Sequence, residues 1–200
     1  YKTVMKLKDR TGKIICGLGV GEHFEYWGFD KNRIVELNWN ENAEIGDGFK
    51  IYCLPSRHFS GRSLFPNRSL WASYLIETPS RKIYIGGDGG YDSHFAEIGK
   101  QFKDIDLAIL ENGQYNEDWK YIHLLPEQIV QSFRDLNAKK LFTGHHSKFA
   151  LGYHPWDEPV KNISAFAEKD SVNLLLPMIG EKVNLEDSIY NIHKWWEGIK

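Results

Sequence analysis

The stretch RKIYIGGDGGYDSHF, residues 81–95, decides the fold that we expect for this chain. From Lys82 to Ile85, polar and apolar side chains alternate as in a strand, and the pattern stops at two glycines. Asp88 follows between two glycine pairs. An apolar pattern of helical spacing then begins, at Tyr91, Phe95, Ile98 and Phe102. A strand, a glycine-rich turn and a helix predict an α/β unit with the Asp88 carboxylate at the end of the sheet.

The same turn also suits an aspartate that caps the following helix, and this stretch alone leaves both roles open. The rest of the chain extends the strand and helix pattern. Further strands are expected near residues 13–16, 33–37, 49–54, 70–77, 107–110 and 139–143. Further helices are expected after Pro126, with Ile129, Phe133 and Leu136 on one face, after Asp157, with Val160, Ile163 and Phe166, and from Glu186 through Trp195. No linker or repeat interrupts them, so residues 1–200 are predicted to form a single mixed α/β domain.

Composition excludes several classes of protein. With 42% apolar residues among 200, the chain can build a sizeable core. A net charge of -2 gives no electrostatic reason to expect a nucleic acid or a membrane surface as partner. No apolar run approaches the roughly 20 residues of a transmembrane helix. Cys16 and Cys53 form no closely spaced pair, which fits a reducing compartment, so we expect a cytoplasmic location.

Two other predicted strands also end in residues that bind metals. His58 follows the strand that includes FKIYCLP, and His145 and His146 follow KKLFTG. A single histidine at a strand end is usually structural. Three strand ends that deliver His, Asp and His favour a site for a first-row metal such as zinc.

Several long segments carry a resemblance to a known family. They are YKTVMKL, NRIVELNW, PSRHFSGRSLFPNRSLWASYLI, YIGGDGGYDSHFAEIGKQFKDIDLAIL, YIHLLPEQIVQSF and HHSKFALGYHPWDEP, in this order. The chain resembles the metallo-β-lactamase-fold hydrolases, in the branch of N-acyl-phosphatidylethanolamine-hydrolysing phospholipase D and its bacterial relatives. The resemblance implies an αββα sandwich with two metal ions, usually zinc, at the sheet edges.

The resemblance also implies roles for single residues. His58 matches a histidine ligand of the first metal, Asp88 the aspartate that bridges both metals, and His145 a histidine ligand of the second. His146 remains the alternative to His145. His123, in YIHLLPEQ, matches a histidine beside the metals that contacts substrate, although a histidine ahead of a proline-started helix needs no function. Asp88 and His123 are therefore the expected catalytic residues.

One departure from the family pattern is large. The family motif His-X-His-X-Asp-His, which supplies the other metal ligands, is absent from the 200 residues. We therefore expect the chain to be the C-terminal part of a metallo-β-lactamase-fold domain whose N-terminal part is missing. Such a chain is expected to bind metal weakly or at one site. Its uncovered sheet is expected to favour a homodimer or association with the missing segment.

The resemblance implies a metal-dependent hydrolase, with a small or lipid-like phosphodiester as the expected substrate. Aromatic segments around Trp27 and up to Trp71 suit either an acyl groove or the core. Arg57 and Arg62 flank His58 and are candidates to meet a phosphate. The alternatives are a lactonase or another hydrolase of the same fold, a nuclease, which the absence of a basic groove disfavours, and a catalytically silent interaction fragment.

Overall fold

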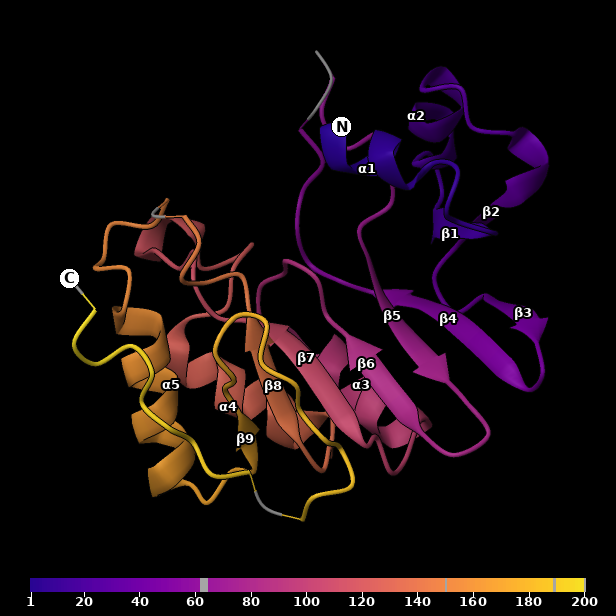
Figure 1. Ribbon diagram of the computed structural model, residues 1–200. Helices are drawn as coiled ribbons and strands as arrows, with labels where there is room; N and C mark the ends of the chain where they lie inside the picture. Colours follow the sequence, from indigo (N-terminus) through magenta and orange to yellow (C-terminus); the bar gives the residue numbers. More distant parts are fainter. Residues whose placement is uncertain (62–64, 150, 189, 200) are drawn as a thin grey trace.

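The computed structural model describes residues 1–61, 65–149, 151–188 and 190–199. Among these residues, a sheet of seven strands forms the centre of the molecule, and the strands lie side by side in chain order (Figure 1). The strands are β3 (Asn42–Gly46), β4 (Phe49–Pro55), β5 (Ala72–Glu77), β6 (Lys82–Ile85), β7 (Leu107–Glu111), β8 (Leu141–Gly144) and β9 (Leu174–Leu175).

Strand direction changes across this sheet. From β3 to β6 each neighbouring pair is antiparallel, whereas from β6 to β9 each pair is parallel. Because β4 and β6 are both antiparallel to β5, they run in the same direction as each other. The carboxyl ends of β4, β6, β7 and β8 therefore meet at one edge of the sheet, where ligands of open α/β sheets commonly bind.

Three helices pack against the parallel half of the sheet and close the core. They are α3 (His94–Gln101), α4 (Pro126–Asp135) and α5 (Glu158–Lys169) (Figure 1). Leu110 on β7, Ile129 on α4 and Ile163 on α5 are at most 2% exposed and belong to one apolar cluster. Burying each of these side chains contributes about 1.5–3 kcal/mol, so this cluster fixes the strands whose ends carry the polar residues.

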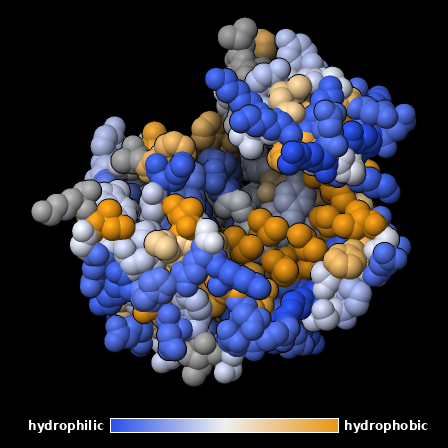
Figure 2. Space-filling model, viewed as in Figure 1, coloured by the Kyte–Doolittle hydropathy of each residue, from blue (hydrophilic) through white to orange (hydrophobic). Residues whose placement is uncertain are grey.

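A smaller element lies beside the antiparallel half. The strands β1 (Ile14–Gly17) and β2 (Ile34–Leu37) pair in parallel and carry the short helices α1 (Lys2–Leu7) and α2 (Gly21–Tyr26). Between this element and the large sheet is an open hollow of about 510 Å³. Its apolar lining is visible in Figure 2 and comes from Ile15, Ile45, Ile51, Tyr74, Ile76 and Ile85. Part of the sheet face is thus uncovered in the described chain.

The predicted fold class is confirmed, since strands and helices combine in a mixed α/β arrangement. Each predicted strand is present within two residues of its expected ends, and the helices after Pro126 and Asp157 are present too. The helix expected from Tyr91 begins at His94, three residues later, and the Tyr91 hydroxyl donates to Asp135 at 2.6 Å. The helices α1 and α2 have only six residues each, too short for a clear helical period.

The helix predicted from Glu186 through Trp195 is wrong. In the described part of this segment the chain forms turns, a bend and irregular backbone, and no helix. Trp196 is 3% exposed in the main core, and the indole N–H of Trp195 donates to Leu176 O at 3.2 Å. Tertiary burial of the tryptophans, and not helical periodicity, therefore explains the apolar spacing here.

Across the described residues, no helix combines the length and the apolar character that a membrane crossing needs.

Candidate metal centre

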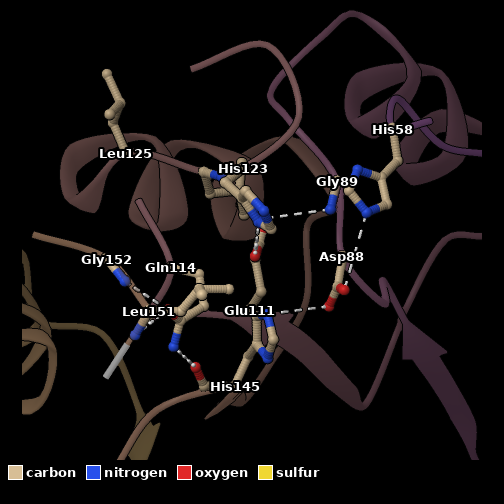
Figure 3. A network of polar contacts seen from close by, with 12 residues as sticks. His58, Asp88, Gly89, Glu111, Gln114, His123, Leu125, His145, Leu151 and Gly152 are labelled. Atoms are coloured by element: carbon tan, nitrogen blue, oxygen red, sulfur yellow. Dashed lines mark hydrogen bonds and ion pairs between the residues drawn. The ribbon is translucent and has the colours of Figure 1, made fainter. Parts of the chain in front are cut away.

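Four polar side chains meet at the edge where β4, β6, β7 and β8 end (Figure 3). His58 follows β4, Asp88 follows β6, Glu111 is the last residue of β7, and His145 follows β8. The four strands run in the same direction, so the sheet itself brings residues far apart in sequence to one place. The structure therefore brings together all three residues that were predicted as metal ligands.

The Asp88 carboxylate faces two imidazole rings. His58 Nε2 lies 3.9 Å from Asp88 Oδ2, and His145 Nε2 lies 3.6 Å from Asp88 Oδ1. These distances are too long for direct hydrogen bonds. Two ligand atoms bound to one zinc ion at about 2.0–2.2 Å lie about 3.4 Å apart when the coordination is tetrahedral. The donor types and their spacing thus fit a shared cation better than direct pairing.

His58 has a second property that fits metal binding. Burial, together with the neighbouring His123, lowers the pKa of His58 below its usual value. The ring is therefore neutral at pH 7, and neutral imidazole is the form that coordinates metals.

His146 points away from this group. Its Nε2 lies 3.1 Å from Thr143 O and its Nδ1 lies 2.9 Å from Ser147 Oγ, so both ring nitrogens have local partners. Of the two adjacent histidines, only His145 faces Asp88. The geometry agrees with the preference for His145.

The glycines around Asp88 have backbone roles. Gly87 has φ +64°, in the left-handed region that residues with a β-carbon rarely adopt. A β-carbon on Gly90 would lie 2.3 Å from Tyr121 O. The turn therefore needs glycine for its own conformation and for close packing against the neighbouring loop.

A buried carboxylate behind Asp88 holds the predicted catalytic histidine. Glu111 is 4% exposed, and its Oε2 lies 2.6 Å from His123 Nδ1. Its Oε1 accepts hydrogen bonds from Gly89 N at 3.1 Å and Leu124 N at 3.0 Å. Glu111 thus connects the turn that carries Asp88 with the loop that carries His123.

Glu111 also controls the charge of His123. Burial alone would lower the pKa of His123, but the hydrogen bond and the negative charge of Glu111 outweigh burial and raise this pKa. The His123 ring lies 5.4 Å from the His58 ring and 5.9 Å from the His145 ring, measured between centroids. A histidine that holds a proton readily therefore lies beside the candidate ligands.

The sequence prediction did not include Glu111. The signal was present, because an acidic side chain ends the apolar run Leu107 to Leu110, as polar residues follow the other strand ends. Glu111, His123 and His145 also offer ligand atoms that all lie within 4.8 Å of one another, and so form a second candidate ligand group.

A second cavity, also of about 510 Å³, opens beside His58 and Asp88. Phe24, Trp27 and Phe65 are among its aromatic lining residues, and Arg68 is part of its wall. The aromatic segment around Trp27 therefore contributes to a cavity as well as to packing.

Of the two arginines that were expected to meet a phosphate, Arg57 has other partners. It forms an ion pair with Asp92 at 3.1 Å, donates to Tyr91 O at 3.2 Å and lies over the Tyr121 ring. Arg62 lies outside the described residues. Arg68, which was not predicted, is the arginine that lines the cavity beside Asp88.

Histidines and an aspartate at the carboxyl edge of such a sheet are typical of metal-dependent hydrolases with the metallo-β-lactamase fold. The chain belongs to the β-lactamase superfamily, because the family model described as "Beta-lactamase superfamily domain" matches residues 1–146.

Comparison with curated proteins gives relatives in several organisms. An uncharacterized protein of Mycobacterium tuberculosis is 40% identical over 182 residues, which are 90% of this chain and 48% of that protein. The mitochondrial N-acyl-phosphatidylethanolamine-hydrolyzing phospholipase D of Saccharomyces cerevisiae is 33% identical over 146 residues, which are 68% of this chain and 31% of that protein. The chain thus spans about half the length of the mycobacterial relative, and less of the yeast enzyme.

Solved structures show the same fold. Igni18, a metallo hydrolase from the archaeon Ignicoccus hospitalis, superimposes with a TM-score of 0.70 at 17% identity, over 90% of this chain and 72% of that chain. The metallo-β-lactamase fold protein YhfI from Bacillus subtilis gives a TM-score of 0.57 at 17% identity, over 81% of this chain and 60% of that chain. At this identity the likeness establishes the fold alone.

Proposed function

We propose that the protein is a metal-dependent hydrolase that cleaves phosphodiesters, with zinc as the metal and with His58, Asp88 and His145 among its ligands. The observation that carries the proposal is the Asp88 carboxylate, whose two oxygens face His58 Nε2 at 3.9 Å and His145 Nε2 at 3.6 Å. Asp88 would therefore hold metal together with His58 and with His145. When bound, the metal ions would supply Lewis-acid chemistry and lower the pKa of water at the site towards neutrality.

Glu111 is the less suitable ligand of the two nearby carboxylates. Both of its oxygens are already engaged, by Gly89 N, Leu124 N and His123 Nδ1. A metal would have to replace hydrogen bonds that no other buried group supplies. The Asp88 carboxylate is 44% exposed, and among the described residues its oxygens make only the two long contacts with histidines. We therefore assign metal binding to Asp88 and orientation of His123 to Glu111.

His123 is the group that we assign to the substrate. Its Nδ1 is held by Glu111, which leaves Nε2 for a partner on the site side of the ring. Because the hydrogen bond and charge of Glu111 outweigh burial and raise the pKa of His123, the protonated form of the ring is favoured. A protonated Nε2 can donate a hydrogen bond to an anionic phosphate oxygen, or a proton to a departing alkoxide.

The cavity beside His58 supports a substrate that is partly apolar and partly anionic. Phe24, Trp27 and Phe65 offer apolar surface, and Arg68 offers a positive charge close to Asp88. The relatives from Saccharomyces cerevisiae and Caenorhabditis elegans are named as phospholipases D that hydrolyse N-acyl-phosphatidylethanolamine. Both observations favour a phosphodiester over a lactone. A cytoplasmic setting is part of the proposal, because Cys16 and Cys53 are buried free thiols.

The test is the metal content and activity of Asp88→Ala in the full-length protein. We expect zinc, measured by inductively coupled plasma mass spectrometry, to fall by at least one equivalent, and hydrolysis of bis(p-nitrophenyl) phosphate to be lost. Asp104→Asn is the matched control, because Asp104 is an exposed aspartate away from the site. Unchanged zinc in Asp88→Ala refutes the ligand assignment. Cleavage of a lactone or β-lactam panel without any phosphodiester cleavage refutes the substrate class.

A further inference from the structure

Gln114, three residues beyond the end of β7, makes four hydrogen bonds to the loop that carries His145 (Figure 3). Its Nε2 donates to His145 O at 3.3 Å and to Phe149 O at 3.4 Å. Its Oε1 accepts from Leu151 N at 3.2 Å and from Gly152 N at 2.8 Å. One side-chain amide, 4% exposed, thus connects both ends of this loop to the end of a core strand.

The backbone at His145 needs such a restraint. His145 has φ +64° and Ser147 has φ +61°, both in the left-handed region that residues with a β-carbon rarely adopt. Conformations of this kind persist only where the surroundings hold them in place. The hydrogen bond from Gln114 to His145 O fixes the peptide group of His145 itself, and with it the direction of the His145 side chain.

Packing from the same strand end adds to this restraint. Gly113 lies so close to the His145 peptide that a β-carbon on it would be 2.1 Å from His145 O. His154 Nε2 lies 2.7 Å from Gly113 O and closes the other side. Gly113 and Gln114 therefore pack closely against the backbone of His145.

The side chain of Gln114 contacts the backbone of this loop, including that of His145, and no imidazole or carboxylate of the candidate ligands. Its partners are four backbone groups, none of which belongs to Asp88, His58 or His123. Any effect of Gln114 on metal binding must therefore pass through His145. This separates it from Glu111, which acts on the other side of the site through His123.

We propose that Gln114 is a positioning residue that holds His145 in its ligand geometry. The inference rests on the proposed function, in which His145 binds a metal. Residues that orient metal ligands typically change metal affinity by about 10–100-fold when they are replaced. We expect an effect of this size on the metal ion that His145 binds.

The test compares Gln114→Met with Tyr115→Phe in the full-length protein. Methionine keeps the length of the side chain and removes all four hydrogen bonds. Tyr115→Phe is the matched control, because it removes hydrogen bonds of the neighbouring residue to Glu158 and Asn162 on α5 and none to this loop. Zinc affinity is measured by competition with a chromophoric chelator. Amide hydrogen exchange at Leu151 and Gly152 is measured on the metal-free protein.

We expect Gln114→Met to weaken one zinc site by about 10-fold or more and to speed exchange at Leu151 and Gly152, while Tyr115→Phe changes neither. Zinc affinity within twofold of wild type in Gln114→Met overturns the proposal, and so does an equal loss of affinity in Tyr115→Phe.

His145→Ala separates this inference from the proposed function. If His145→Ala leaves zinc binding unchanged, the proposed ligand set fails, and the positioning role for metal binding fails with it. If His145→Ala loses zinc but Gln114→Met does not, only the positioning role fails.

Gln114→Glu decides the question if the methionine variant does not fold. Glutamate keeps the oxygen that accepts from Leu151 N and Gly152 N but cannot donate to His145 O or Phe149 O. We expect protected amides at Leu151 and Gly152 together with weakened zinc binding. Zinc affinity within twofold of wild type in this variant also overturns the proposal.

Discussion

Replacement of Glu111 tests whether the end of β7 supports the site through buried hydrogen bonds. In Glu111→Ala, three buried donors lose their acceptor: Gly89 N, Leu124 N and His123 Nδ1. Each unpaired buried donor costs about 1–3 kcal/mol, and loss of one partner of a buried ion pair costs about 3–5 kcal/mol. Since these costs overlap, we expect the free energy of unfolding to fall by about 3–5 kcal/mol.

Glu111→Gln separates the backbone bonds from the bond to His123. The glutamine oxygen can still accept from Gly89 N and Leu124 N, while the amide nitrogen takes the place of the oxygen that faced His123. The charge-assisted bond is therefore replaced by a neutral one, in which the amide donates to a deprotonated His123 Nδ1. Charged hydrogen bonds contribute about 1.5–3 kcal/mol and neutral ones about 0.5–1.5 kcal/mol, which predicts a loss of about 1–2 kcal/mol. The alanine variant should therefore lose more stability than the glutamine variant.

The assay is urea unfolding at pH 7 with metal removed by a chelator, because bound metal would add stability of its own. Glu97→Gln is the control, since Glu97 is exposed and bonds only to Ser93 among the described residues. We expect it to stay within about 0.5 kcal/mol of wild type. If both Glu111 variants lose less than about 1 kcal/mol, or if they lose equal amounts, the reasoning on buried donors is refuted.

Two further predictions concern regions away from the site. Burial alone would raise the pKa of Asp106, but hydrogen bonds from Lys139 and Lys82 N outweigh it and lower this pKa. A lowered folded pKa stabilises the protein above the unfolded pKa of about 3.9. Asp106→Asn should therefore lose about 1 kcal/mol at pH 7 and progressively less as the pH falls below 4. The measurement is urea unfolding between pH 7 and pH 3. A loss of unfolding free energy that does not change with pH over this range would contradict the prediction. The second prediction concerns the uncovered apolar face of the large sheet, which should promote self-association of a protein that consists of residues 1–200. Light scattering should show less association for Ile45→Lys, and a wild-type monomer at all concentrations would contradict the prediction.

Local patterns were sufficient to predict Asp88 and His145 at the ends of their strands. Asp88 and His145 each follow a short apolar run and a glycine, and this pattern needs no knowledge of distant contacts. Once the strand direction is known, parallel strands bring such residues to one edge. Glu111 follows the same rule and was recognisable on the same grounds.

The residues that hold these side chains were not predictable in this way. Gln114 bonds to groups 31 to 38 positions further along the chain, and its own neighbourhood in sequence contains no sign of them. The segment from Glu186 through Trp195 was expected to be a helix, but Trp196 is buried and Trp195 partly buried by tertiary contacts without one. Positioning residues are defined by the packed fold, which local periodicity does not encode.

Residues at the end of β7 hold two different histidines of the site in place. Glu111 fixes the orientation of His123, and two to three residues later Gly113 and Gln114 fix the backbone of His145. The strand lies between β6 and β8 in the parallel half, so it is the one position that borders both the Asp88 turn and the His145 loop. Displacement of this strand end would move residues on both sides of Asp88 together. Variants at Glu111 and Gln114 should therefore couple, and their double mutant should deviate from additivity in zinc affinity although their side chains share no partner.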